Sequence, residues 1–185
     1  MKQNGRICIM KKEMSVNETV RESLAIALLH LMKKKDFSKI TVSELVKLAG
    51  VGRSSFYRNF YSKEELLFSY VTDLYREFFN QEKIPLCASE ADRIESFLLP
   101  RFCFIKKHRE IFKALHDHGM LYEFFNKIEK DLIIILCGQH EGTNIYYRAM
   151  FSGSCAGIVR CWIEGGFAES EETMVKLFAN PPKHF

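Results

Sequence analysis

The sequence predicts an all-α protein with an N-terminal three-helix domain and a small second helical domain. Apolar residues recur three and four positions apart along much of the 185-residue chain, which is the spacing of one face of a helix. Ser and Thr residues stand before several of these segments at helix-cap spacing, and glycines separate two of the shortest. A chain of this length can bury a real hydrophobic core.

The first predicted helix covers about residues 16–35. Leu24, Leu28 and Leu31 fall on one side of it and should face the core. Three consecutive lysines, at positions 33–35, stand near its C-terminal end, where the helix dipole favours positive charge.

The most informative stretch is 41–66, TVSELVKLAGVGRSSFYRNFYSKEEL, which predicts two short helices around a glycine turn. Thr41 and Glu44 stand at capping-box spacing just before the first apolar run. Gly50 and Gly52 end that helix, because glycine takes left-handed or tight-turn backbone at little cost.

A second short helix over residues 53–60 follows the turn, and Ser62 and Glu65 form another capping box that opens a helix over about 63–80. A helix, a glycine turn and a short helix in this order are typical of a helix-turn-helix, here at about residues 41–60. The second helix of that motif is the one that enters a DNA groove.

The helix over 53–60 has two chemically different faces. Phe56 and Phe60 are four residues apart and should pack into the core. The other side and its edges carry hydroxyl, amide and guanidinium groups, which can meet base edges or phosphates. These residues are Arg53, Ser54, Ser55, Tyr57, Arg58 and Asn59. An ordinary helical hairpin with a solvated face is the alternative, but the whole constellation favours a DNA reader.

Three short motifs stand in a fixed order here: Ala49-Gly50-Val51, then Tyr57 with Phe60, then Ser62-Lys63-Glu64 with a leucine at position 66. In this combination residues 17–77 resemble the DNA-binding domain of the TetR family of transcriptional regulators. The resemblance implies that the phosphate contacts come from Thr41, Tyr57 and Lys63. It implies that the bases are faced by positions 53–55, 58 and 59, with Gly52 at the helix start. Gly52 and Ser54 depart from the family, which often has Ser and Gly there.

Charge is unevenly distributed along the chain. Residues 1–63 hold 13 Lys and Arg against 5 Asp and Glu, whereas the remaining residues hold 14 against 18. A basic N-terminal part on a mildly acidic body suits an anionic polymer that binds at one end. Residues 1–15 form a basic tail that either follows the DNA backbone or is merely a solvated extension. Its cations are Lys2, Arg6, Lys11 and Lys12.

The sequence places the DNA-binding domain at 16–77, a linker with Pro85 at 81–90, and a helical effector-binding and dimerisation domain within 81–185. In the second domain, helices are predicted near 91–107, 109–116, 120–137, 144–164 and 170–179, with a kink or break at Pro100.

Small residues line one edge of the helix over 144–164. Ala149, Gly153 and Gly157 are four apart, so another backbone can approach closely, and each glycine lowers helix stability by ~1 kcal/mol relative to alanine. In TetR-like proteins the last two helices of each subunit form a four-helix dimer interface, and these helices resemble that pair. Tight packing within one subunit is the alternative.

The second domain is rich in aromatic residues. The family resemblance implies a cavity for a small-molecule effector, for which Phe102, Phe125 and Trp162 are the candidate lining residues; plain core packing is the alternative at each. The segment YYRAMFSGSCAGIVRCWIEGG also resembles the C-terminal domain of regulators linked to dihydroxyacetone kinase operons, one type of which acts through a protein partner. A homodimeric repressor released by an effector is therefore expected, and a co-regulator that acts through a protein partner is the alternative.

Catalysis and metal binding have little support. No glycine-rich phosphate loop, G-x-S-x-G or H-E-x-x-H motif is present, and no cofactor is implied. The pairs His116/His118 and Cys137/His140 each lack the three or four convergent ligands of a tetrahedral site, so solvated loops or helix ends are favoured. Six scattered cysteines indicate reduced, mostly buried thiols. With no signal peptide or membrane span, a cytoplasmic protein is expected.

Overall fold

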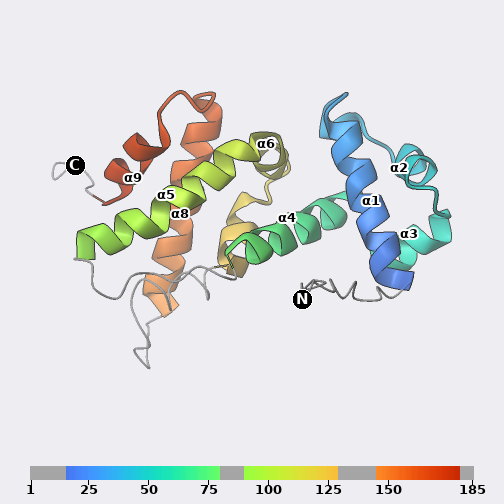
Figure 1. The fold of residues 1–185 in the computed structure, drawn as a ribbon, viewed down its shortest axis with the longest axis horizontal. Coiled ribbons are helices and arrows are strands. Elements are labelled where there is room, and N and C mark those ends of the chain that lie inside the picture. Colours follow the sequence, from blue (N-terminus) through green and yellow to red (C-terminus); the bar gives the residue numbers. More distant parts are fainter. Residues whose placement is uncertain (1–15, 80–89, 129–144, 180–185) are drawn as a thin grey trace, which may run out of the picture. The chain divides into compact units, whose positions relative to one another are not determined.

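The computed structural model describes residues 16–79, 90–128 and 145–179, and every regular element among them is a helix (Figure 1). The all-α prediction is confirmed. The helices are α1 (Val16–Met32), the 3₁₀ turn η1 (Phe37–Lys39), α2 (Val42–Ala49), α3 (Arg53–Asn59), α4 (Lys63–Phe79), α5 (Glu90–Lys107), α6 (Arg109–Asp117), α8 (Ile145–Glu164) and α9 (Glu171–Ala179). Residues 121–128 are also helical.

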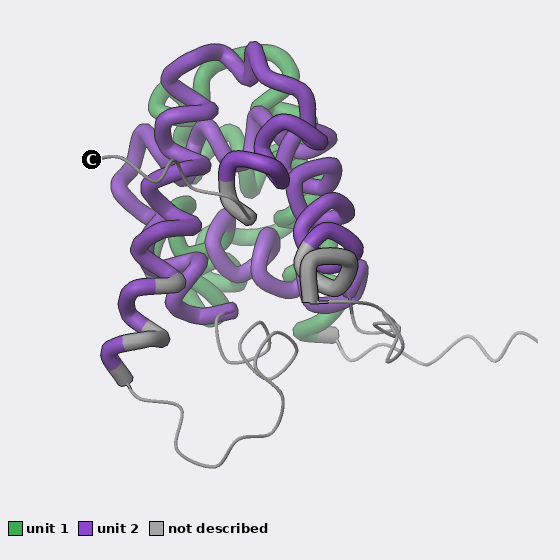
Figure 2. Tube along the Cα trace, turned by 90° about the vertical axis from the view of Figure 1, so that its left-hand side faces the viewer, with its two compact units in different colours: residues 1–66 green, residues 67–185 purple. Residues whose placement is uncertain are grey.

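The chain divides into two compact units, residues 1–66 and residues 67–185 (Figure 2). The dividing point lies in the first turn of α4, so this helix runs from unit 1 into unit 2. The functional boundary predicted from the sequence, between residues 77 and 81, stays a prediction.

Unit 1 is held together by apolar side chains from its helices. Leu24 and Leu28 of α1 are fully buried, as are Leu45 of α2 and Phe56 of α3. α1 packs against both α2 and α3. Burial of a large apolar side chain contributes about 1.5–3 kcal/mol, so this shared core fixes the position of α3.

The first helix is shorter than predicted. It ends at Met32, and the lysines at 33–35 form a turn that leads into η1, which the sequence did not predict. The side chain of Lys35 extends toward the following segment, and its Nζ donates to the backbone oxygen of Lys39 at 3.0 Å. The side chain of Lys35 therefore contacts the segment after the helix rather than its last turn.

Unit 2 has an aromatic core. Its largest fully buried side chains include Phe97, Phe104, Phe112, Phe124 and Trp162. α5 packs along α9, and α6 packs against α8. The ring of Phe124 lies 5.4 Å from that of Phe112, edge to face, which is a favourable aromatic geometry.

Pro100 neither ends α5 nor divides it. The helix runs from Glu90 to Lys107 with this proline inside it. A proline removes one backbone donor and disturbs the preceding turn. In that turn the guanidinium of the buried Arg101 donates to the carbonyl oxygen of Phe97 at 2.6 Å, one residue after Ser96, whose carbonyl lacks a helical donor because of the proline.

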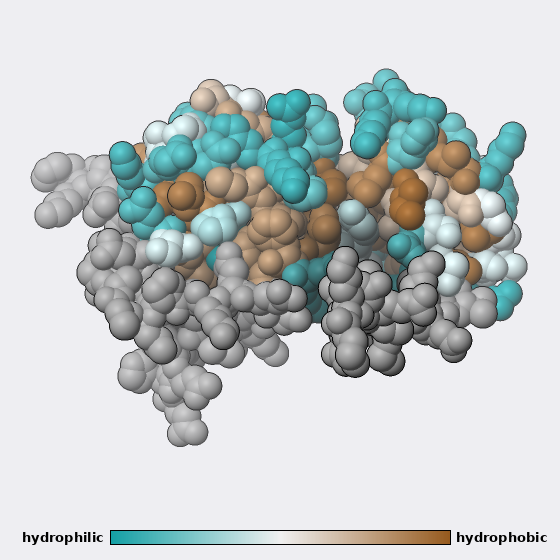
Figure 3. Space-filling view, viewed as in Figure 1, coloured by the Kyte–Doolittle hydropathy of each residue, from teal (hydrophilic) through white to brown (hydrophobic). Residues whose placement is uncertain are grey.

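Hydrophobic side chains also reach the surface of both units, as the space-filling view shows for one face (Figure 3). In unit 1 the large exposed ones include Ile26 and Leu48. Single exposed apolar residues are common on folded proteins and indicate no site by themselves. Among the described residues, none of the helices is long and apolar enough to cross a membrane.

Several sequence predictions fall outside the described residues. These are the basic tail over 1–15, with Lys2, Arg6, Lys11 and Lys12, most of the linker over 81–90, the second half of the helix predicted over 120–137, and the Cys137/His140 pair.

Candidate nucleic-acid interface

The capping box at the start of α2 is present as predicted. The backbone N–H of Glu44 donates to the hydroxyl of Thr41 at 3.3 Å, and the backbone N–H of Thr41 donates to the Glu44 carboxylate at 3.0 Å. The Thr41 hydroxyl also donates to that carboxylate, at 2.8 Å. These reciprocal bonds fix where the helix-turn-helix begins.

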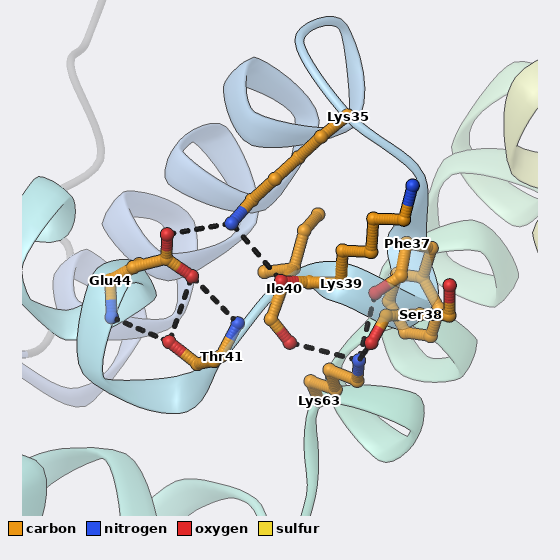
Figure 4. Close-up of polar contacts among 8 residues, drawn as sticks. All are labelled: Lys35, Phe37, Ser38, Lys39, Ile40, Thr41, Glu44 and Lys63. Atoms are coloured by element: carbon orange, nitrogen blue, oxygen red, sulfur yellow. Dashed lines mark hydrogen bonds and ion pairs between the residues drawn. The ribbon is translucent and has the colours of Figure 1, made fainter.

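Glu44 has a third partner outside the box. The ammonium of Lys35 lies 2.6 Å from the second carboxylate oxygen, so the carboxylate joins α2 to the turn after α1 (Figure 4). The Lys35 bond, followed by the two bonds from Thr41, lowers the pKa of Glu44 from 4.5 to about 2. Each of these donors favours the charged carboxylate.

The turn between α2 and α3 depends on Gly50. Its φ of 68° and ψ of 26° place it in the left-handed region. The N–H of Val51 then reaches back to the carbonyl oxygen of Val46 at 3.0 Å, a Schellman-type helix ending that glycine favours. The turn predicted from Gly50 is therefore confirmed, and it directs the chain into α3.

α3 has the two faces that the sequence predicts. Phe56 and Phe60 are buried, and their ring centroids lie 6.1 Å apart. The guanidinium of Arg21, from α1, lies 4.7 Å from the Phe60 ring, a contact that sequence reasoning missed. The outward side is accessible: Arg53, Ser54, Tyr57 and Arg58 are exposed, and Ser55 and Asn59 are half-buried.

Two outward side chains are already oriented by neighbours. The Arg53 guanidinium donates to the hydroxyl of Ser43 on α2 in a short hydrogen bond. The Asn59 amide donates to the carbonyl oxygen of Ser55 at 2.8 Å, within α3 itself. Ser43 is therefore a site residue that sequence reasoning did not identify, because the pairing depends on the angle between two helices.

The second capping box is only half formed. The N–H of Glu65 donates to the hydroxyl of Ser62 at 3.1 Å, as predicted. The Glu65 carboxylate, however, accepts from the N–H of Tyr61 at 2.6 Å, whereas the box requires it to accept from the cap residue itself.

Lys63, the first residue of α4, points away from its own helix. Its ammonium donates to the carbonyl oxygens of Phe37 at 2.8 Å, Ser38 at 3.1 Å and Ile40 at 2.9 Å (Figure 4). It also lies 4.6 Å from the centroid of the Phe37 ring. The predicted phosphate contact stays a prediction, and the side chain is engaged with η1.

The small-residue edge of α8 is accessible in the single chain. Ala149 is exposed, and Gly153 and Gly157 are half-buried. A Cβ atom added at either glycine would meet no described atom within 4 Å. The opposite side of the helix is buried, with Val159, Trp162 and Ile163 in the core. Close packing within the subunit therefore does not account for these glycines among the described residues.

The three candidate pocket residues are buried. Phe102 and Trp162 contact each other, with ring centroids 5.6 Å apart, whereas Phe125 lies against Phe124 at 5.3 Å. The indole N–H of Trp162 donates to the carbonyl oxygen of Glu169 at 3.2 Å. The structure thus brings two of the three together and places them in ring-to-ring packing.

The thiols differ from the sequence expectation of mostly buried cysteines. Cys155 is buried, and burial raises the pKa of its thiol to about 12. Cys103 and Cys161 are exposed, so the expectation is wrong for both. The cysteines outside the described residues are Cys8, Cys87 and Cys137.

The histidine pair lies at a helix end. His116 belongs to the last turn of α6, and its Nε2 lies 3.6 Å from the carboxylate of Glu164 on α8. His118 is the C-cap of α6. Within the described ranges there is no group of three or more His, Cys, Asp and Glu side chains placed to hold a metal ion.

Comparisons with known proteins agree with this geometry. A family model described as "Bacterial regulatory proteins, tetR family" matches residues 27–70, and a second, described as "Transcriptional regulator C-terminal region", matches residues 92–180. A curated relative, the uncharacterized HTH-type transcriptional regulator YxbF of Bacillus subtilis (strain 168), is 22% identical over 171 residues. That match covers 85% of this chain and 43% of the relative, so the chain spans less than half the relative's length.

The fold has a solved counterpart. The crystal structure of a TetR transcriptional regulator from Streptococcus agalactiae 2603V matches with a TM-score of 0.59 and 22% identity, over 88% of this chain and 93% of that one. This likeness bears on the fold alone. One family model matches mostly residues of unit 1 and the other lies within unit 2, and the resemblance seen in the motifs around α2 and α3 points the same way. The chain belongs to the TetR family of transcriptional regulators.

Proposed function

We propose that this regulator is a cytoplasmic repressor that binds a near-palindromic DNA operator as a homodimer and is released by a small effector. The observation that carries the proposal is the accessible polar side of α3, held outward by the burial of Phe56 and Phe60. A short helix anchored this way presents several hydrogen-bonding groups to a major groove at once.

The proposed DNA contacts divide by chemistry. Tyr57, a residue that is 57% exposed, binds a phosphate oxygen beside the groove. The resemblance assigns a second phosphate to Thr41, whose hydroxyl must release the Glu44 carboxylate to donate to it. Base edges are met from α3 by Arg53, Ser54, Ser55, Arg58 and Asn59, and Gly52 lies against the DNA at the start of that helix. The resemblance also assigns a phosphate contact to Lys63. To make it, the Lys63 ammonium must break at least one of its hydrogen bonds to backbone carbonyls, such as that to Phe37.

The proposed dimer forms through α8 and α9. The accessible edge at Ala149, Gly153 and Gly157 lets a second copy of the helix approach closely. A symmetric dimer carries two α3 helices, which meet half-sites one helical turn or a multiple of it apart, ~34 Å per turn. A near-palindromic operator follows from that symmetry.

The proposed effector is a small, largely apolar or aromatic molecule that binds in unit 2 near Phe102, Phe125 and Trp162. It acts by binding more tightly to the arrangement that does not fit DNA. A 100-fold loss of operator affinity requires ~2.7 kcal/mol of coupling, which lies within the usual allosteric range.

Binding of the purified protein to DNA from upstream of its own gene tests the proposal. Fluorescence anisotropy at several salt concentrations should show tight, salt-dependent binding. Arg58→Ala should alter the preference among operator variants, because a guanidinium on a base edge discriminates by about 1–3 kcal/mol. Equal affinity of the wild type for the upstream DNA and for random duplexes would contradict a specific regulator.

A second candidate function is a TetR-fold co-regulator that acts through a protein partner. The burial of Phe102 and Trp162 and their direct ring contact favour it, because both candidate pocket residues are already packed against each other in the core. Two results together would support this candidate. The purified protein would bind the upstream DNA only after a second protein, isolated from a cell extract, is added, and none of the small molecules in a broad screen would change that binding.

A further inference from the structure

The ammonium of Lys63 uses all of its hydrogen-bond donors inside the protein. Protonated lysine has three N–H donors and no acceptor. Three carbonyl oxygens, of Phe37, Ser38 and Ile40, lie 2.8, 3.1 and 2.9 Å from Nζ. The side chain is only 14% exposed. A phosphate oxygen could be bound only if one of these three bonds were broken.

The position of Lys63 in its own helix does not explain the contact. It is the first residue of α4, where the helix dipole favours negative rather than positive groups. Its charge instead meets the carbonyl oxygens of Phe37 and Ser38 in η1 and of Ile40 directly after it, which converge on one point (Figure 4). Lys35 holds the remaining carbonyl of this segment, that of Lys39, at 3.0 Å. Two ammonium groups therefore hold the carbonyls of residues 37–40.

The contact joins the two ends of the helix-turn-helix. The carbonyls of residues 37–40 directly precede Thr41, the cap of α2, and Lys63 begins the helix that follows α3. The three hydrogen bonds span 23 to 26 residues. All of α2, the glycine turn and α3 lie between the two anchored points. A bond that closes this loop limits how far α2 and α3 can shift relative to α4.

We propose that Lys63 is a positioning residue rather than a ligand for DNA phosphate. Through η1 it fixes the frame of the helix-turn-helix, by which we mean the position of the start of α2 relative to the first turn of α4. This inference rests on the proposed DNA binding for its effect on affinity, but the contact itself belongs to the free protein. The two roles differ in one measurable quantity. A lost phosphate contact lowers the slope of log K against log salt by about 0.9, whereas a disturbed frame weakens binding at an unchanged slope.

Two substitutions separate the roles. Lys63→Met keeps the length of the side chain and removes the ammonium. Lys63→Arg keeps the charge, but a planar guanidinium cannot direct three donors at carbonyls grouped around one point. For a positioning residue, both variants should weaken operator binding about 10-fold at each salt concentration, with slopes within about 0.3 of the wild type. Binding is measured well below the melting temperature of each variant.

Lys39→Met is the matched charge control. Lys39 belongs to the same turn, is 71% exposed and pairs only loosely with Asp36, at 3.3 Å. Its loss removes one cation from the segment while the Lys63 contacts remain, so operator affinity should change less than for Lys63→Met. An affinity loss as large as that of Lys63→Met would overturn the positioning role, because charge alone would then explain both.

Amide hydrogen exchange tests the contact without DNA. The N–H of Glu44, which donates to Thr41, should exchange faster in both Lys63 variants than in the wild type and in Lys39→Met. If the wild type bound no DNA, the proposed function would fail while this measurement still decided the positioning role. Wild-type affinity of Lys63→Arg, together with a slope lowered by about 0.9 in Lys63→Met, would establish the phosphate role instead.

Discussion

At the scale of single residues, the start of α2 depends on one carboxylate with several donors. Glu44 accepts from the Thr41 backbone, the Thr41 hydroxyl and the Lys35 ammonium. Removal of any one donor leaves the others in place. Removal of the negative charge weakens all three at once, because each contact is stronger to a carboxylate than to a neutral group.

Acid should therefore loosen unit 1 through Glu44. Its pKa is lowered in the folded state, from 4.5 to about 2, so its contribution to stability is present above pH 4.5 and is lost as the pH falls through about 2. The free energy of unfolding, measured with urea between pH 5 and pH 2, should fall more steeply for the wild type than for Glu44→Gln. Parallel curves for the two proteins would show that Glu44 titrates normally.

Gly50 should be more sensitive to substitution than Gly52, two residues away. Gly50→Ala places a Cβ on left-handed backbone, at φ 68°, which costs about 1 kcal/mol or more of folding stability. No described atom lies within 4 Å of that Cβ, so the strain comes from the backbone alone.

Gly52→Ser is the matched comparison. Gly52 caps α3 at φ −78°, which any residue adopts, and an added Cβ would lie 3.7 Å from the Ser54 hydroxyl, an ordinary contact. A serine caps a helix better than glycine, so stability should rise by about 0.5 kcal/mol. Denaturant unfolding measures both changes, and a loss of stability in Gly52→Ser would contradict the assigned cap geometry.

At the scale of elements, the helices and their caps were largely predictable because their signals are local. Thr41 with Glu44, the glycine at 50, and the spacing of Phe56 and Phe60 each lie within a few residues, and each appears in the structure as predicted. The turn η1 was not predictable, because two of its carbonyl oxygens, those of Phe37 and Ser38, are held by Lys63 from 26 and 25 residues away.

Contacts between helices set two features of the structure that local sequence signals did not predict. Of the kink or break predicted at Pro100, the break is absent, because α5 continues through the proline and packs along α9. The accessible side of α3 followed from its periodicity, whereas the pairing of Arg53 with Ser43 did not. Helical spacing places side chains around one axis, but it carries no information about the angle between two helices.

That pairing leads to a prediction about specificity. The Ser43 hydroxyl holds the guanidinium of Arg53 in one direction. Under the proposed function, Ser43→Ala frees this guanidinium, so discrimination at the base pair it meets should fall by about 1 kcal/mol while the salt slope is unchanged. Competition binding with operator variants measures the change.

Ser23→Ala is the control for Ser43→Ala. The Ser23 hydroxyl donates to the Thr19 carbonyl oxygen within α1, at 2.9 Å, and has no contact with α3 among the described hydrogen bonds. Its loss should leave operator preference unchanged. Equal effects of the two substitutions would show that the Ser43 bond does not orient Arg53.

At the scale of the whole molecule, the proposed function requires two copies of the chain. One α3 helix reads a half-site of a few base pairs, and two linked copies gain affinity because the second binding event becomes intramolecular. In the proposed dimer, the accessible, small-residue edge of α8 forms this association. Its glycines lower the stability of an isolated helix. In the proposed dimer, close packing of a second copy against them offsets this loss.

Gly153→Leu should therefore separate the subunits without unfolding them. The added side chain meets no described atom of its own subunit near its Cβ, and leucine stabilises a helix by up to about 1 kcal/mol relative to glycine. Sedimentation at micromolar concentration should give twice the chain mass for the wild type and a single chain mass for the variant, with helical content retained. Lys113→Leu adds the same side chain to the exposed side of α6 and should stay dimeric.

Loss of the dimer should also weaken binding to a full operator, because the two α3 helices are then no longer joined. A monomeric Gly153→Leu protein binds each half-site independently, so its affinity for a full operator should fall toward its affinity for a half-site, with unchanged preference among bases. Wild-type and variant proteins should then bind an isolated half-site equally well, since α3 lies in unit 1 and keeps its core. A dimeric mass for Gly153→Leu would place the interface elsewhere than on this edge of α8, and a single-chain mass for the wild type would contradict the proposed dimer.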